Sequence, residues 1–170
     1  RTRAELDYLV EPDLFHDFFG HVPLLSNPVF ANYMQMYGQR ALEAGAKIDL
    51  LARLYWYTVE FGLIRTAKGL KIYGAGILSS AAEVQHAIAG DGVERLPFEA
   101  ASVMRRPYTI DKLQDTYFVL DDFRQLFEAV YDGVPESLRA EYHSVVGDTL
   151  LGQGEAPEGE RAYALLRHLF

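Results

Sequence analysis

Proline and glycine divide the first part of the chain into short segments, which limits it to short helices joined by tight turns. Pro12 and Pro28 each stand where a helix can begin, since the first helical residue needs no intrahelical partner for its N–H. Gly20 and Gly45 stand where such helices can end. The sequence therefore predicts two helices, over about residues 12–19 and 28–44.

The rest of the chain continues as helices with little strand. An apolar run over residues 49–64 predicts a third helix, with Asp49 as its cap, and a turn follows at residues 67–69. Two glycines interrupt the next apolar run, so residues 71–80 are expected to form a short strand or a tight loop. Later segments are expected as a helix from Ser79 or Ser80 to 89, a loop over 90–107, a strand over 117–120, a helix from Asp121 or Asp122 to 131, and helices over 135–151 and 160–170.

The composition excludes several classes of protein. The chain has 170 residues, of which 49% are hydrophobic, and this suits one domain or a large part of one. The net charge of −8 and the lack of a basic run argue against a nucleic-acid partner. Because cysteine is absent, the chain has no disulfides or thiolate ligands, which fits a cytoplasmic location. No apolar run is long enough to span a membrane.

The segment EPDLFHDFFGHVP places two histidines, His16 and His21, five residues apart. On an ideal α-helix this spacing separates two side chains by about 140°, so two helical histidines could not share a metal. If the helix ends at Gly20, the backbone beyond it is free to fold His21 back toward His16. On these residues alone, a metal site and a structural role at a helix end and in the core are both open.

Glu60 is the only residue charged at neutral pH in the segment LYWYTVEFGLI, residues 54–64. A carboxylate among such neighbours is expected to be buried, and it then needs a proton, hydrogen bonds or a cation. Arg53 and Arg65 lie seven and five residues away, which are not spacings that bring side chains together on a helix. We therefore expect a metal as the partner of Glu60.

Two imidazoles and one carboxylate are the ligand set of non-haem Fe(II) oxygenases, in which the remaining coordination positions stay open. Zinc hydrolases also use two histidines and a glutamate. Their usual helical motif has histidines four apart with a glutamate between them. Here the spacing is five and Asp17 follows the first histidine, which favours iron and keeps a zinc hydrolase as the alternative.

Three blocks of the sequence resemble the pterin-dependent aromatic amino acid hydroxylases, and most of all the bacterial members that act on phenylalanine. The blocks are EPDLFHDFFGHVPLLSNPVFANYMQ, LYWYTVEFGLI and IYGAGILSSAAEVQ, in this order and spacing. The resemblance implies a partial hydroxylase catalytic domain over residues 1–132, mainly α with a few short strands. Residues 133–170 would form a C-terminal helical extension of unknown role.

In this family the matching histidines and glutamate hold Fe(II), so the resemblance makes His16, His21 and Glu60 the metal ligands and the catalytic residues. A tetrahydropterin and O₂ react at that iron to hydroxylate the ring of the amino acid. The serine that matches Ser79 supports the first iron histidine, a role that fixes ring orientation. On sequence alone, Ser79 could equally be a helix N-cap.

The resemblance also assigns residues to the two organic ligands. Those that match the pterin site are Asp17, Ala52 and Tyr55, and those that match the amino-acid site are Arg1, Pro12, Trp56, Gly76 and Ser79. The guanidinium of Arg1 is suited to a bidentate contact with the substrate carboxylate. Without the resemblance, Arg1 and Asp17 would be read as solvated charges and Trp56 as core.

We therefore expect an Fe(II)- and tetrahydropterin-dependent monooxygenase that converts L-phenylalanine to L-tyrosine. Related activities on tryptophan, tyrosine or the 3-position of phenylalanine stay open. A metal-binding but inactive fragment is a further alternative, because the family segment that carries a pterin-stacking phenylalanine precedes the position of Arg1 and is not in this chain. The last helix could serve self-association, but packing is favoured and no oligomer is predicted.

Overall fold

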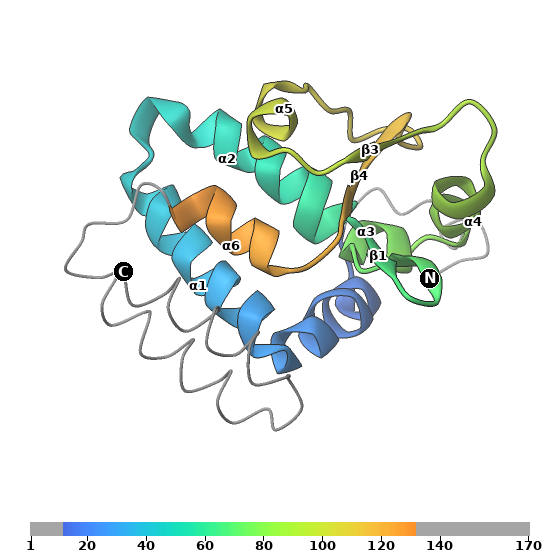
Figure 1. Ribbon diagram of the computed structural model, residues 1–170, viewed down its shortest axis with the longest axis horizontal. Coiled ribbons are helices and arrows are strands. Elements are labelled where there is room, and N and C mark those ends of the chain that lie inside the picture. The colour runs from blue at the N-terminus through green and yellow to red at the C-terminus, as the bar shows by residue number, and fades with distance from the viewer. Residues whose placement is uncertain (1–11, 132–170) are drawn as a thin grey trace. The chain divides into compact units, whose positions relative to one another are not determined.

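The computed structural model describes residues 12–131 of the chain (Figure 1). The chain divides into two compact units, Arg1–Ala129 and Val130–Phe170, and nearly all the described residues belong to the first. The described part is mainly helical with one small sheet, as predicted. Arg1 lies outside the described residues, as do the expected helices at 135–151 and 160–170. The proposed boundary between residues 132 and 133 stays a prediction.

Short helices make up most of the described part. In chain order they are the π-helix η2 (His16–His21), the 3₁₀-helix η3 (Val22–Ser26), α1 (Pro28–Glu43), the 3₁₀-helix η4 (Gly45–Lys47), α2 (Ile48–Tyr55), the π-helix η5 (Trp56–Glu60), α3 (Ala75–Leu78), α4 (Ala81–Ala89), α5 (Ala100–Arg105) and α6 (Arg124–Tyr131). Among residues 12–131, no helix combines the length and the apolar character that crossing a bilayer requires.

Four strands form one mixed sheet in the order β2-β1-β4-β3. They are β1 (Leu63–Thr66), β2 (Gly69–Ile72), β3 (Glu94–Pro97) and β4 (Thr116–Leu120). Strands β1 and β2 form an antiparallel hairpin, whereas β4 pairs in parallel with both β1 and β3. All five residues of β4 are buried, which is typical of a strand with neighbours on both sides (Figure 1).

The core next to the sheet joins residues from strands and helices that are far apart in the sequence. Buried side chains from β1 and the turn before it, from β4, and from helices α3 and α4 form one cluster: Phe61, Leu63, Ile77, Ala87, Tyr117 and Val119. Helix α3 also packs against η2 and η5, and so lies between the two π-helices. This helix therefore fixes how the segments around residues 16–21 and 56–60 meet.

Local capping explains why several predicted helices form where they do. The side chain of Asn27 accepts hydrogen bonds from the N–H groups of Val29 and Phe30 at the start of α1. Ser80 caps α4 by accepting from the N–H of Glu83. The predicted helices over 28–44, from Ser79 or Ser80 to 89 and from Asp121 or Asp122 to 131 are confirmed within a few residues, as is the strand over 117–120.

The predicted helix over residues 49–64 starts within one residue of the expected position, but its predicted cap and its predicted end are wrong. Helix α2 begins at Ile48, so Asp49 lies in its first turn and is not its cap. The helical stretch ends at Glu60, and Leu63 and Ile64 belong to β1. Periodicity cannot tell a buried strand from the end of a buried helix when both are apolar.

The predicted loop over residues 90–107 is also wrong, since it contains β3 and α5. Strand β3 includes Pro97 and, within residues 12–131, pairs only with β4, which fits an edge strand. Helix α5 is capped by Glu99, whose carboxylate accepts from the N–H groups of Ala101 and Ser102. Residues 71–80 contain the end of β2, as expected, but also the unforeseen helix α3.

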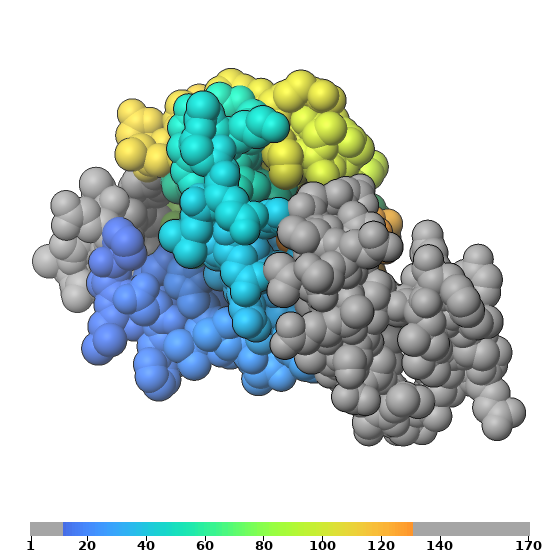
Figure 2. Space-filling model, turned by 90° about the vertical axis from the view of Figure 1, so that its left-hand side faces the viewer, coloured from blue at the N-terminus to red at the C-terminus, as the bar shows by residue number. Residues whose placement is uncertain are grey.

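Exposed apolar side chains gather on the segment that carries the two histidines. They are Leu14, Phe15, Phe18, Phe19, Val22 and Leu25. This segment forms part of the molecular surface in the blue region of Figure 2. The histidine segment is thus amphipathic, with His16 on its buried side.

Candidate metal centre

The two histidines lie on one π-helix, and the expected helix end at Gly20 is wrong. The helical turns begin at Leu14 and continue as η2 through Gly20 to His21. The N–H of Val22 bonds to the carbonyl of Asp17, five residues earlier, which is the π-helical pattern. Because a π-turn joins residues i and i+5, it places His16 and His21 on the same face.

Glu60 is presented by a second π-helix, η5. The N–H of Phe61 bonds to the carbonyl of Trp56 at 2.8 Å, again five residues earlier. Helix α2 thus continues directly into the wider π-helix η5, and Glu60 is the last residue of η5. Single π-turns of this kind are rare and occur often at functional sites.

Glycines allow the two π-helices to approach α3 closely. A Cβ placed on Gly20 would lie 2.6 Å from the Cβ of Ala75. A Cβ placed on Gly76 would lie 2.9 Å from the ring of Phe61 and 3.1 Å from the carbonyl oxygen of Glu60. Both contacts are shorter than a side chain tolerates without displacement, so the site depends on glycine at these positions.

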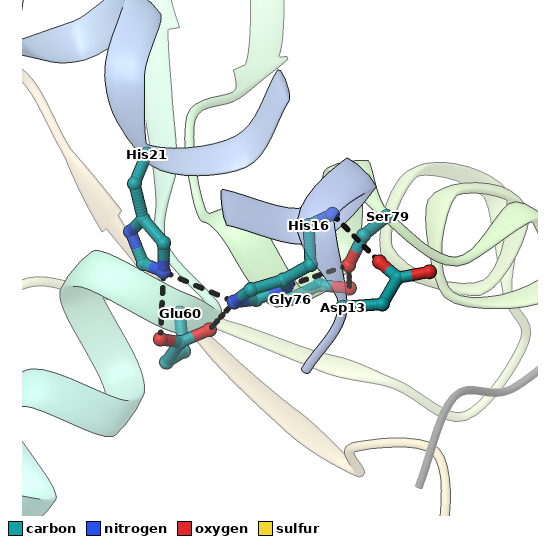
Figure 3. Close-up of polar contacts among 6 residues, drawn as sticks. All are labelled: Asp13, His16, His21, Glu60, Gly76 and Ser79. Carbon is teal, nitrogen blue, oxygen red and sulfur yellow. Dashed lines mark hydrogen bonds and ion pairs between the residues drawn. The ribbon is translucent and has the colours of Figure 1, made fainter. Parts of the chain in front are cut away.

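The three side chains predicted as ligands converge (Figure 3). The Nε2 atoms of His16 and His21 are 3.0 Å apart. Glu60 Oε2 lies 3.6 Å from His16 Nε2, and Glu60 Oε1 lies 3.3 Å from His21 Nε2. One potential ligand atom from each residue lies within 4.8 Å of the others. Two imidazole nitrogens and a carboxylate oxygen therefore face one point.

The tautomer of His16 follows from its contact with Ser79. The hydroxyl of Ser79 donates to the carbonyl of Gly76 at 3.2 Å, so its oxygen can accept the Nδ1–H of His16 at 2.9 Å (Figure 3). A proton on Nδ1 leaves the lone pair on Nε2, the atom that points at Glu60. The backbone N–H of His16 donates to Asp13 Oδ1 at 2.9 Å, which holds the start of η2.

The charge of Glu60 governs the electrostatics of the site. A hydrogen bond with Glu60 raises the pKa of His21, partial burial opposes this, and the charges of Glu60 and Asp17 add to the rise. Burial, with a smaller contribution from Glu60, raises the pKa of Tyr55 to about 12, so this phenol stays neutral. The site thus favours a positive charge between Glu60 and the imidazoles.

The donor set suits a divalent transition metal. Two neutral imidazoles and one carboxylate match non-haem Fe(II), and they also occur around Zn²⁺. His16 is buried, while the side chains of His21 and Glu60 are 25% and 14% exposed. Three ligands with this partial exposure leave room for further groups at the metal.

The remaining sequence-predicted residues lie at varying distances from this centre. Gly76 and Ser79 belong to the α3 region and are linked to His16 by hydrogen bonds. Pro12 and Asp17 are exposed, whereas Ala52 and Tyr55 are half-buried on α2. The roles of these residues toward a pterin or an amino acid stay predictions.

Trp56 is held in place by Gln114 and Tyr108, neither of which was predicted from the sequence as a site residue. Its indole N–H donates to Gln114 Oε1 at 3.0 Å, and its ring stacks on Tyr108 with centroids 4.5 Å apart. Gln114 and Trp56 are 58 residues apart, so no local pattern could have joined them. Asp13 was also missed, although its place just before a helical segment is a common capping signal.

Comparison with known proteins supports the resemblance. Residues 1–143 match the family described as biopterin-dependent aromatic amino acid hydroxylase. A phenylalanine-4-hydroxylase of Ralstonia nicotianae is 61% identical over 131 residues, which are 76% of this chain and 42% of that protein. A phenylalanine-4-hydroxylase of Caulobacter vibrioides is 48% identical over 170 residues, covering 96% of this chain and 58% of that protein.

Solved structures agree with these relatives. Phenylalanine hydroxylase from Chromobacterium violaceum bound to cobalt has a TM-score of 0.73 and 53% identity, over 77% of this chain and 48% of that one. The chain thus spans about half the length of the proteins that it matches. Because the family match extends over most of its length, the chain belongs to the biopterin-dependent aromatic amino acid hydroxylases.

Proposed function

We propose that this chain carries the iron site of an Fe(II)- and tetrahydropterin-dependent monooxygenase that hydroxylates L-phenylalanine to L-tyrosine. The observation behind the proposal is the convergence of His16, His21 and Glu60 in a member of this family. Names of relatives from several bacteria support phenylalanine as the substrate. The partners would be small molecules, and the lack of cysteine fits a cytoplasmic enzyme.

The protein's own residues would divide the work between metal and substrate. His16, His21 and Glu60 would hold Fe(II), and Glu60 would neutralise one of its two charges. When bound, the iron would provide the place where O₂ and the reduced pterin react. Ser79 keeps the proton of His16 on Nδ1, so that Nε2 remains a donor for the metal.

The organic ligands would be bound by the residues that the resemblance assigns. Pro12, Trp56 and Gly76 would bound the space for the aromatic ring, with Ser79 beside them. Arg1 would pair with the carboxylate of the amino acid, as a guanidinium does in a bidentate contact. Asp17, Ala52 and Tyr55 would contact the pterin, and the neutral phenol of Tyr55 would be available as a hydrogen-bond donor.

A second candidate is a domain that binds the metal but is inactive by itself, and the limited share of its relatives that the chain covers supports it. Since it matches 42% of the Ralstonia protein and 48% of the cobalt-bound structure, the chain by itself would bind the metal without turnover. Residues found in the relatives outside the matched part would then complete the cofactor site. The two candidates share the metal centre and differ in whether this chain alone is sufficient.

Metal titration tests the shared centre. We expect about one Fe(II), or Co(II) as a coloured substitute, per chain. Glu60→Gln and His21→Ala should both lose that site, because an amide is a poor ligand and alanine is none. Glu43→Gln, which changes an exposed acid on α1, is the matched control. Unchanged stoichiometry in both site variants would refute the assignment.

Turnover then separates the two candidates. Purified chain would be loaded with Fe(II) and given phenylalanine, O₂ and a reduced tetrahydropterin, and tyrosine would be quantified by chromatography. Tyrosine at more than one equivalent per chain supports the monooxygenase. Metal binding without tyrosine supports the alternative, and the absence of metal binding contradicts both.

A further inference from the structure

Gln114 is a buried amide whose side chain joins the indole of Trp56 to the loop that precedes β4. Its Oε1 accepts the indole N–H at 3.0 Å, and its Nε2 donates to the carbonyls of Thr109 and Lys112 at 3.0 and 3.1 Å. Both ends of the amide are therefore used, although only 3% of the residue is exposed. We propose that Gln114 is a positioning residue that fixes the direction of the Trp56 indole N–H, and with it the orientation of the ring, and so shapes the aromatic pocket. The part concerning the pocket rests on the proposed function.

Ring packing alone sets the plane of the indole but not the direction in which its N–H points. Tyr108 stacks on it with centroids 4.5 Å apart and planes 15° apart, and Phe61 lies at 4.6 Å and 32°. Stacked rings tolerate sliding and in-plane rotation at little cost. A hydrogen bond from the indole N–H has one direction, so Gln114 Oε1 selects one orientation of the ring.

Gln114 can act in this way because its own backbone is held by α4. Its N–H donates to Glu83 Oε1 at 3.1 Å, and its carbonyl is 3.0 Å from His86 Nε2. The hydroxyl of Tyr117 donates to the same oxygen of Glu83. The amide is therefore anchored on the helix and strand core, while its side chain reaches the indole.

A chain of contacts connects Trp56 to the metal centre. Trp56 opens the π-helix that ends at Glu60, and its ring packs on Phe61. The ring of Phe61 lies against Gly76, where an added Cβ would be 2.9 Å away. The carbonyl of Gly76 accepts from Ser79, which bonds to His16. A change in the orientation of the indole is thus expected to alter the pocket beside the proposed ligands.

The chain contains one tryptophan, so the indole N–H gives a single, assignable NMR signal. Its exchange with water would be measured in the full metal-free chain and in two variants of Gln114. Gln114→Met removes the acceptor, while Gln114→Glu keeps an oxygen for the indole but loses the bonds to the carbonyls of Thr109 and Lys112. Tyr57→Phe is the matched control, because it removes a bond from the Tyr57 hydroxyl to the Pro107 carbonyl in the same loop.

We expect a protected indole N–H in the parent chain and exchange about fivefold or more faster in Gln114→Met, the loss expected for one hydrogen bond. Gln114→Glu should give an exchange rate between those of Gln114→Met and the parent, and Tyr57→Phe should equal the parent. An unprotected indole N–H in the parent would overturn the proposal without recourse to any variant. Equal protection in Gln114→Met would overturn it as well.

The same signal would follow a titration with L-phenylalanine in the Co(II)-loaded chain. We expect Gln114→Met to weaken binding about fivefold, and Tyr57→Phe to leave it unchanged. Unaltered affinity in Gln114→Met, with protection lost, would overturn the role in shaping the pocket. If the parent chain binds no phenylalanine, the proposed substrate site fails, while the exchange experiment still decides whether Gln114 fixes the indole.

Discussion

At the scale of single residues, the candidate metal centre depends on which ring nitrogens of His16 and His21 carry a proton. The Ser79 oxygen accepts a hydrogen bond from the Nδ1–H of His16, because the Ser79 hydroxyl donates its own hydrogen bond to the carbonyl of Gly76. The Nε2 atom of His16 then keeps a lone pair that can bind a metal, and the imidazole stays neutral. His21 instead responds to Glu60, whose hydrogen bond raises the pKa of this imidazole.

Replacing Ser79 by alanine should weaken metal binding about tenfold, the lower end of the range for groups that orient metal ligands. The cause would be loss of the bond that fixes the ring and tautomer of His16. Co(II) titration followed by absorbance gives the affinity. Ser102→Ala, at an exposed position on α5, is the control, and equal affinities in the two variants would contradict the role of Ser79.

Glu83 should make stability fall as the pH rises. Burial raises its pKa above the usual 4.5, and the bonds from Tyr117 and Gln114 only partly oppose this. Between the unfolded value of 4.5 and the raised folded value, the folded state binds more protons than the unfolded state, so unfolding becomes easier with rising pH. Glu83 Oε2 is buried with no hydrogen-bond partner among the described residues.

Urea unfolding of the parent and of Glu83→Gln across this pH range measures the effect. The variant keeps an oxygen for Tyr117 and Gln114 but cannot ionise. The stability of the parent relative to the variant should therefore decrease as the pH increases. A difference that stays constant with pH would show that Glu83 does not titrate in this way.

At the scale of elements, the site is built from two π-turns that flank α3. Each π-turn ends at a proposed ligand, His21 in η2 and Glu60 in η5. An α-helical turn would place residues five apart on different faces, so the pairing of His16 with His21 requires the wider turn. Gly20 lets η2 pack directly on Ala75 of α3.

Gly20→Ala should therefore harm both stability and metal binding. The new Cβ would lie 2.6 Å from the Cβ of Ala75, and relieving this overlap should cost about 1–3 kcal/mol and shift η2. Gly38→Ala on α1 is the control, because nothing lies within 4 Å of its Cβ. That substitution should stabilise the chain by about 0.5–1 kcal/mol, as usual for glycine to alanine in a helix. Denaturation and Co(II) titration would measure both variants, and a Gly20→Ala chain as stable as the parent would contradict the close packing.

At the scale of the whole described part, the sheet ties the site to the core. Strand β1 begins three residues after Glu60 and lies between β2 and β4. Leu63 is fully buried and is paired with Ile72 on one side and Val119 on the other. Glu60 thus lies three residues before one of the most deeply buried side chains among residues 12–131.

Leu63→Ala should lower the free energy of unfolding by about 2–5 kcal/mol, as expected for a large cavity in a buried core. Leu42→Ala, which changes a side chain that is 90% exposed on α1, should change it by less than about 0.5 kcal/mol. Urea denaturation followed by circular dichroism gives both values. A similar small change in both variants would place β1 outside the cooperative core.

The sequence by itself determined the features that act within one helical turn or that depend on residue type. Pro28 marks a helix start because the first helical residue needs no intrahelical partner for its N–H, and Ser80 marks one because its side-chain oxygen bonds to the N–H three residues later. His16, His21 and Glu60 could be selected as candidate ligands because imidazoles and an isolated acid in apolar segments need a partner. These inferences required no knowledge of how distant segments meet.

Only the tertiary structure decided the geometry that makes these residues a site. The π-turn at His16–His21 depends on packing of Gly20 against Ala75, far along the chain, and a local pattern does not distinguish it from an α-turn that ends. Leu63 and Ile64 became strand because β4 pairs with them in parallel. Gln114 meets Trp56 across 58 residues. Such contacts arise from the packing of whole elements, whose free energy is not encoded in any one segment.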